Sequence, residues 1–168
     1  MKIRYKQQKF QEDAAKAVVD VFKGQPYLTK LYMIDRGIEP VQQSLTEEDN
    51  FTGYRNHKLE IRDEQILKNL KEVQIANNIK PSDELKKTLD CYNLTIEMET
   101  GVGKTYTYIK TIHELHKAYG WSKFIIVVPS MAIREGVYKS FKMTQDHFAD
   151  EYGEKIRFFI YDSKFYES

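Results

Sequence analysis

A glycine-rich stretch near the middle of the chain has the residue types of a loop that holds phosphate groups: Met98-Glu99-Thr100-Gly101-Val102-Gly103-Lys104-Thr105. Gly101 and Gly103 allow backbone N–H groups to curl around phosphate oxygens without obstruction by side chains. Lys104 can place a full positive charge on the β- and γ-phosphates, and the hydroxyl of Thr105 can bind Mg²⁺. The stretch therefore predicts a site for a nucleoside triphosphate, with ATP as the expected ligand and Mg²⁺ as its ion.

The first position of this loop departs from the strict pattern G-x-x-x-x-G-K-S/T, because Met98 stands where the pattern has glycine. Loops of the helicase type relax that position, so the departure indicates a subclass of the motif. A strand is expected before the loop and a helix after it, which separates a phosphate loop from a chance glycine-rich turn. The positive end of the helix that begins near Lys104 adds to the attraction for phosphate.

The second half of the chain alternates predicted strands with predicted helices. Strands are expected at residues 92–98, 123–128 and 156–161, and helices at residues 104–119 and from Ser130 onward. The continuous apolar run at 123–128 is typical of a strand buried on both faces of a parallel sheet. This order predicts an α/β fold in which helical crossovers join parallel strands. We assign these elements, residues 92–168, to one part of the chain and residues 1–91 to another.

The first part of the chain is expected to be mostly helical. Apolar side chains recur at three- and four-residue spacing in residues 10–23 and 62–78, which predicts two helices. Ser82, followed by two acidic residues, is expected to begin a short third helix. From residue 27 to about residue 58 the periodicity fades, and a long loop is predicted there.

Composition indicates a globular chain and excludes several classes of protein. Lys and Arg number 26 against 25 Asp and Glu, so no overall charge favours binding to nucleic acid. Cys91 is the single cysteine, which excludes an internal disulfide and a cysteine zinc cluster and suits a reducing cytoplasm. The longest apolar run, residues 124–128, is too short to span a bilayer. We therefore expect a cytoplasmic protein that is not inserted in a membrane.

Several stretches around the phosphate loop have a recognisable order. The most specific are Leu94 to Tyr106, Lys123 to Ser130 and Ala132 to Val137, and weaker likeness extends to Phe10 to Ala14 and Phe158 to Ser163. Together they resemble the restriction (Res) subunit of Type III restriction–modification enzymes. Such subunits are superfamily-two helicase-like motors, fused to a C-terminal nuclease, that act on double-stranded DNA with a methyltransferase (Mod) subunit. The resemblance implies the N-terminal, ATP-binding part of a DNA translocase, with an incomplete RecA-like domain.

The resemblance also implies roles for individual residues. Thr100 to Thr105 matches helicase motif I, and Gln11 matches the glutamine of the Q motif, whose amide can pair with the edge of adenine. Ser130 and Arg134 match the region of motif Ia, where they could hold a DNA phosphate. Without the resemblance these two are a helix cap and a solvated arginine. The expected cofactor-binding residues are Gln11, Thr100, Gly101, Val102, Gly103, Lys104 and Thr105, with Thr105 also a metal ligand.

No residue of the chain is assigned to catalysis. Hydrolysis in this class needs an acidic pair on a later strand, and arginine fingers from a second RecA-like domain. No Asp-Glu-x-His or Asp-Glu-x-Asp sequence follows Lys104, and Asp162 is followed by Ser163. Two alternatives stay open. One is another P-loop NTPase, such as a phosphotransferase or GTPase, and the other is a stand-alone nucleotide- or DNA-binding module without catalysis.

Overall fold

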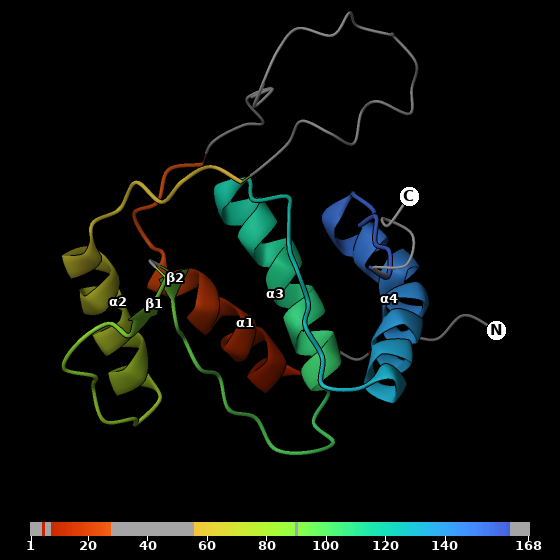
Figure 1. Cartoon of the computed structure of the whole chain (residues 1–168), viewed down its shortest axis with the longest axis horizontal. Helices are drawn as coiled ribbons and strands as arrows, with labels where there is room; N and C mark the ends of the chain where they lie inside the picture. Colours follow the sequence, from red (N-terminus) through yellow and green to blue (C-terminus); the bar gives the residue numbers. More distant parts are fainter. Residues whose placement is uncertain (1–4, 6–7, 28–55, 90, 162–168) are drawn as a thin grey trace, which may run out of the picture. The chain divides into compact units, whose positions relative to one another are not determined.

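A computed structural model describes residues 5, 8–27, 56–89 and 91–161 of the chain. The elements in these residues are α1 (Lys9–Val21), α2 (Asp63–Ala76), β1 (Lys87–Thr88), β2 (Cys91–Tyr92), α3 (Lys104–Tyr119) and α4 (Met131–Tyr152) (Figure 1). They form two compact units. The first unit consists of the described residues up to Ala17, of Thr95–His113, and of the described residues from Ile126 onward. The second unit consists of the described residues from Val18 to Leu94, together with Glu114–Ile125.

The core of the first unit lies where the first turns of α3 meet the second half of α4. Its buried members are Ile109, Phe141 and Phe148. Beside this core, Tyr106 pairs with His147, and Lys110, one turn along α3, pairs with Glu151, one turn along α4. The second pair lies four residues further along the sequence in both helices. The helices α3 and α4 therefore run in the same general direction (Figure 1).

Both ends of α4 have a recognisable cap. At the start, the hydroxyl of Ser130 accepts a hydrogen bond from the N–H of Ile133 at 3.3 Å, which satisfies one of the free donors of the first turn. At the other end, Gly153 has a φ of 77°, the left-handed conformation that glycine adopts with little strain after a helix. The predicted helix start at Ser130 is confirmed.

In the second unit, side chains close the C-terminal end of α1. Asn69 of α2 is buried, and its amide donates to the carbonyls of Val21 at 3.0 Å and Lys23 at 2.8 Å. The hydroxyl of Tyr119 donates to the carbonyl of Val19 at 2.8 Å. A helix leaves its last carbonyls without partners, and these three bonds supply them.

A short antiparallel hairpin completes the second unit. Lys87 pairs with Tyr92, and Thr88 with Cys91. Asp63, the first residue of α2, contacts both the ammonium of Lys87 and the hydroxyl of Tyr92. The hydrogen bond from Lys87, with help from Tyr92, lowers the pKa of the Asp63 carboxyl.

The helices predicted at residues 10–23, 62–78 and 104–119 are observed as α1, α2 and α3 with similar or identical bounds. The prediction of a short helix that begins at Ser82 is wrong. The N–H of Ser82 donates to Gln74 Oε1, and its hydroxyl accepts from Gln74 Nε2, both at 2.8 Å. The hydroxyl is thus used by α2 instead of capping a new helix. Most of the predicted loop at 27–58 lies outside the described residues.

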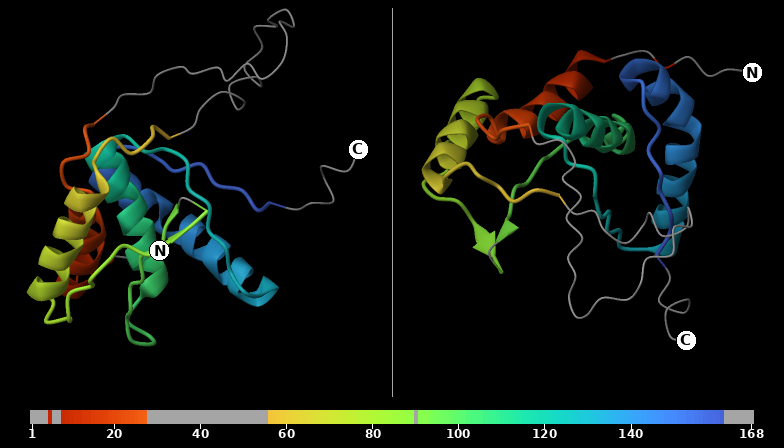
Figure 2. Two further views of the ribbon diagram at one scale, coloured as in Figure 1. Left: turned by 60° about the vertical axis from the view of Figure 1, so that its left-hand side comes forward. Right: turned by 90° about the horizontal axis from the view of Figure 1, so that it is seen from above.

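The parallel sheet is not confirmed in the part of the chain that the structure describes. Of the predicted strand 92–98 only Tyr92 lies in a strand, and that strand is antiparallel, while 123–128 and 156–161 form neither strand nor helix (Figure 2). Ile125 and Val127 are 92% and 87% exposed. A strand of a parallel sheet needs hydrogen-bonding neighbours and cover on both faces. No described strand pairs with these segments, so their apolar pattern is not matched by sheet structure.

Candidate nucleotide-binding site

The predicted phosphate loop connects an extended segment to α3. Gly101 and Gly103 have φ angles of 85° and 88°, in the region that residues with a Cβ enter only with strain. Lys104 is the first residue of α3, whose first turn holds no acidic side chain. The positive end of this helix therefore meets no carboxylate from its own first turn. Such a backbone can turn N–H groups toward an anion.

Gln11 of α1 contacts this loop, although 91 positions separate it from Val102. Gln11 is only 8% exposed, and its Nε2 donates to the carbonyl of Val102 at 2.8 Å. A Cβ on residue 103 would lie 2.6 Å from the same nitrogen, so glycine at 103 leaves room for the amide. The structure thus brings Gln11 together with the loop through a direct contact with the loop backbone.

The first turn of α3 holds the other side of the loop. The N–H and the hydroxyl of Thr107 both donate to the carbonyl of Gly103, at 3.0 and 3.2 Å. Between them, Lys104 is exposed and Thr105 is half-buried. The loop is therefore held at Val102 and Gly103, while the lysine that is expected to contact phosphate stays accessible.

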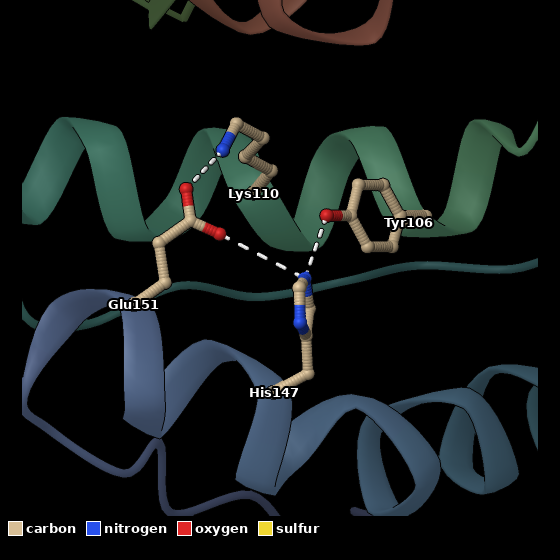
Figure 3. A network of polar contacts seen from close by, with 4 residues as sticks. All are labelled: Tyr106, Lys110, His147 and Glu151. Carbon is tan, nitrogen blue, oxygen red and sulfur yellow. Dashed lines mark hydrogen bonds and ion pairs between the residues drawn. The ribbon is translucent and has the colours of Figure 1, made fainter. Parts of the chain in front are cut away.

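A group of polar residues that no motif marks lies on the faces where α3 and α4 meet (Figure 3). The Tyr106 hydroxyl is 2.8 Å from His147 Nε2, and Lys110 Nζ is 2.5 Å from Glu151 Oε1. Burial, and then the charge of Glu151, raises the pKa of Tyr106 to about 12, so its phenol keeps its proton at neutral pH. The four-residue spacing within each helix is the signal that could have suggested this group.

The two residues predicted to bind DNA phosphate lie at the start of α4. Ser130 is exposed and serves as the helix cap. Arg134 is half-buried, with Nη2 3.5 Å from Glu135 Oε1, and its buried Nε has no hydrogen-bond partner among the described residues. Arg134 therefore retains donor capacity that the described part of the protein does not use.

Within the described ranges, no group of three or more His, Cys, Asp and Glu side chains could hold a metal ion. The expected Mg²⁺ ligand is a single hydroxyl, that of Thr105, and this fits an ion that keeps several waters and binds mainly through phosphate oxygens. No helix in the same ranges is long and apolar enough to cross a membrane.

The glycine-rich loop before α3 and its contact with Gln11 fit the class of P-loop proteins of the helicase type. Residues 4–164 match the family described as Type III restriction enzyme, res subunit. The chain is 38% identical over 113 residues to the EcoPI Res subunit of Escherichia phage P1, and 38% identical over 114 residues to the EcoP15I Res subunit of Escherichia coli. Each alignment covers 65% of this chain and 11% of the relative. With the StyLTI Res subunit of Salmonella typhimurium it shares 43% identity over 65 residues, 38% of this chain and 7% of the relative.

The chain therefore belongs to the Type III restriction enzyme Res subunit family, and this membership implies a helicase-like RecA fold. It spans about a tenth of the length of the two relatives given first.

Proposed function

We propose that this chain is the N-terminal, ATP-binding portion of an ATP-dependent, helicase-like Res subunit of a Type III restriction–modification enzyme. The observation that carries the proposal is the hydrogen bond from Gln11 to Val102, which joins two motifs expected around a nucleotide. Membership of the family supports the same function, since the matched relatives are named as Res subunits of such enzymes.

In this proposal the loop from Thr100 to Gly103 surrounds the phosphates of ATP with backbone N–H groups. Lys104 faces the β- and γ-phosphates, and the hydroxyl of Thr105 binds the Mg²⁺ that bridges them. The left-handed φ angles of Gly101 and Gly103, and the exposure of Lys104, support these roles.

Gln11 is proposed to contact adenine as well as the loop. Its Nε2 is engaged with Val102, which leaves Oε1 as an acceptor. Adenine presents an amino group on its pairing edge, whereas guanine presents a carbonyl oxygen at the equivalent place. An amide oxygen there would favour ATP over GTP.

We also propose that the full-length protein completes a parallel sheet around residues 92–98, 123–128 and 156–161. The common direction of α3 and α4 supports this, because successive helices on one face of a parallel sheet run the same way. The proposed sheet lies in the second part of the chain, residues 92–168, and its remaining strands come from outside the described residues.

The start of α4 is proposed to hold a phosphate of double-stranded DNA. The unsatisfied Nε of Arg134 and the helix end beside Ser130 support this placement. In the full-length enzyme the partner is the methyltransferase (Mod) subunit, and the expected compartment is the cytoplasm.

Binding is expected without efficient catalysis. An arginine finger in P-loop enzymes is worth about a thousandfold or more in rate, and no such residue is assigned here. The chain alone is therefore expected neither to hydrolyse ATP rapidly nor to cut DNA.

Nucleotide binding tests the proposal directly. Binding of Mg·ATP to the chain can be measured by displacement of a fluorescent ATP analogue. We expect this binding to be weak but measurable in the parent chain and absent in Lys104→Ala. Lys117→Ala is the matched control, because Lys117 is an exposed lysine in the last turn of the same helix. Equal affinity of the parent chain and Lys104→Ala would refute the assignment.

A further inference from the structure

We propose that His147 is a positioning residue for the phosphate loop. Through the hydroxyl of Tyr106 it fixes the first turn of α3, and the Lys110–Glu151 pair holds the same two helices one turn further on. The inference rests on the proposed ATP-binding function and names residues of α3 and α4 that no motif marks.

The two contacts form a ladder between the helices. Tyr106 and Lys110 are four residues apart on α3, and His147 and Glu151 are four residues apart on α4 (Figure 3). Residues at this spacing lie on one face of a helix. A single contact between helices permits rotation about itself, whereas two contacts one turn apart oppose both rotation and sliding.

The ladder is partly shielded from water, which strengthens its polar contacts. The Lys110 side chain is only 5% exposed, against 24% for Glu151. Aromatic rings enclose the other contact: the Tyr5 ring lies 4.9 Å from the His147 ring, and the Phe148 ring lies 5.0 Å from the rings of both Tyr106 and His147. Rings packed on several sides have few rotamers, so the hydroxyl and the imidazole are held facing each other.

The tyrosine of the pair is a hydrogen-bond donor at neutral pH. Its pKa is raised to about 12, so the Tyr106 hydroxyl keeps its proton and can donate to His147 Nε2. Glu151 Oε2, 3.7 Å from the same nitrogen, is too far for a hydrogen bond, while Lys110 balances its charge.

The ladder acts on the loop because its first contact is adjacent to the ligand-facing residues. Tyr106 directly follows Lys104 and Thr105, and the next residue, Thr107, bonds the carbonyl of Gly103. A shift of the Tyr106 backbone therefore moves the hydroxyl that binds Mg²⁺ and the charge that faces phosphate. Displacements of about 1 Å at such positions have large effects on binding and catalysis.

The experiment measures the Kd for Mg·ATP well below the melting temperature, and the melting temperature itself, for four single variants and one double variant. Tyr106→Phe removes only the hydroxyl, whereas His147→Leu removes the acceptor together with the ring that packs on Tyr5 and Phe148. Both should weaken Mg·ATP binding about fivefold, the equivalent of one hydrogen bond. The double variant should bind Mg·ATP no more weakly than either single variant. His147→Gln, whose amide can accept from the same hydroxyl, should bind within about twofold of the parent chain. Asp146→Asn, a change at the exposed neighbouring position on α4, is the control and should bind like the parent.

A purely structural role would lower the melting temperature of Tyr106→Phe while leaving its Kd unchanged, and that outcome would overturn the inference. Losses that add in the double variant, or no recovery in His147→Gln, would do the same. If the parent chain and Lys104→Ala bind Mg·ATP equally, the proposed function fails and this inference fails with it. If Lys104→Ala loses binding while Tyr106→Phe binds like the parent, only the positioning role fails.

Discussion

The phosphate loop and the apolar segments on either side of α3 have equally suggestive sequences, yet they differ in how completely the described residues support them. In the loop, Gly101 and Gly103 have the left-handed φ angles expected of a phosphate loop. The loop also accepts one hydrogen bond from Gln11 and two from Thr107. The segment around Ile125 and Val127 has the pattern of a buried strand, but both residues are almost fully exposed.

This difference follows from where each structure finds its hydrogen-bond partners. A helix satisfies its backbone four residues away, and a loop of this kind needs only one or two side chains to hold it. A strand needs a second strand along its whole length, and a parallel neighbour is always distant in sequence. The loop can therefore form from the described residues, while the apolar segments find no strand to pair with among those residues.

Substitution of a buried isoleucine in α3, the helix that follows the loop, and of an exposed isoleucine in the apolar segment should give the largest contrast in stability. Ile109→Ala, at a position 1% exposed in the core of the first unit, should lower the free energy of unfolding by about 2–5 kcal/mol. Ile125→Ala should change it by less than about 0.5 kcal/mol, since little surface is buried there. Urea unfolding of both variants measures the difference, and similar losses would show that the segment around Ile125 is packed in solution.

A methyl group at the tightest point of the loop should have the next largest effect. In Gly103→Ala the new Cβ meets Gln11 Nε2, and alanine must adopt a left-handed φ, a strain of about 1–3 kcal/mol. Mg·ATP affinity should fall by more than about fivefold, the equivalent of the lower end of that range. Gly136→Ala is the matched control: Gly136 lies within α4, where a Cβ meets nothing within 4 Å, so ATP binding should be unchanged. Normal ATP binding by Gly103→Ala would contradict the close fit of Gln11.

Removal of the Gln11 amide should have a smaller and more selective effect. Gln11→Ala loses one hydrogen bond to the loop, so ATP binding should weaken about fivefold. GTP binding should weaken less if Gln11 also contacts adenine, and competition of ATP and GTP with a fluorescent analogue measures both. An unchanged ATP-to-GTP ratio would limit Gln11 to the loop and exclude the adenine contact.

The smallest expected effect is that of a hydroxyl in the exposed segment. Val127→Thr should leave the free energy of unfolding within about 0.5 kcal/mol of the parent. The same change at Val137, which lies on α4 and packs against the core of the first unit, should lower the free energy of unfolding by about 1 kcal/mol because it buries part of a hydroxyl. If Val127→Thr is as costly as Val137→Thr, the comparison between the two regions does not hold.

Local signals predicted much of the fold correctly. The apolar spacing at residues 104–119 gave the bounds of α3, and the hydroxyl of Ser130 marked the start of α4. Ser82 has the same capping chemistry but begins no helix, because Gln74, eight positions earlier, bonds its hydroxyl and N–H. The sequence around Ser82 does not show that competition.

The candidate site divides in the same way. The likeness to motif I indicates Lys104 and Thr105, and the likeness to the Q motif indicates Gln11. The structure shows a hydrogen bond between Gln11 and Val102. His147 belongs to no motif, and its partner Tyr106 lies 41 positions earlier in the chain. The four-residue spacing within each helix indicates residues on one face, but only the packing of α3 on α4 shows which residue pairs with which.

The length of α4 has a mechanical consequence. Phe141, Phe148, His147 and Glu151 hold its second half against α3 and the core of the first unit, while its first residue, Met131, lies about 15 Å from Phe141 along the helix axis. A helix held along one half behaves as a lever arm. With an arm of that length, a tilt of about 4° at Phe141 moves the end beside Ser130 and Arg134 by about 1 Å. Small rotations of the packed half therefore become displacements on the ångström scale at the opposite end of the helix.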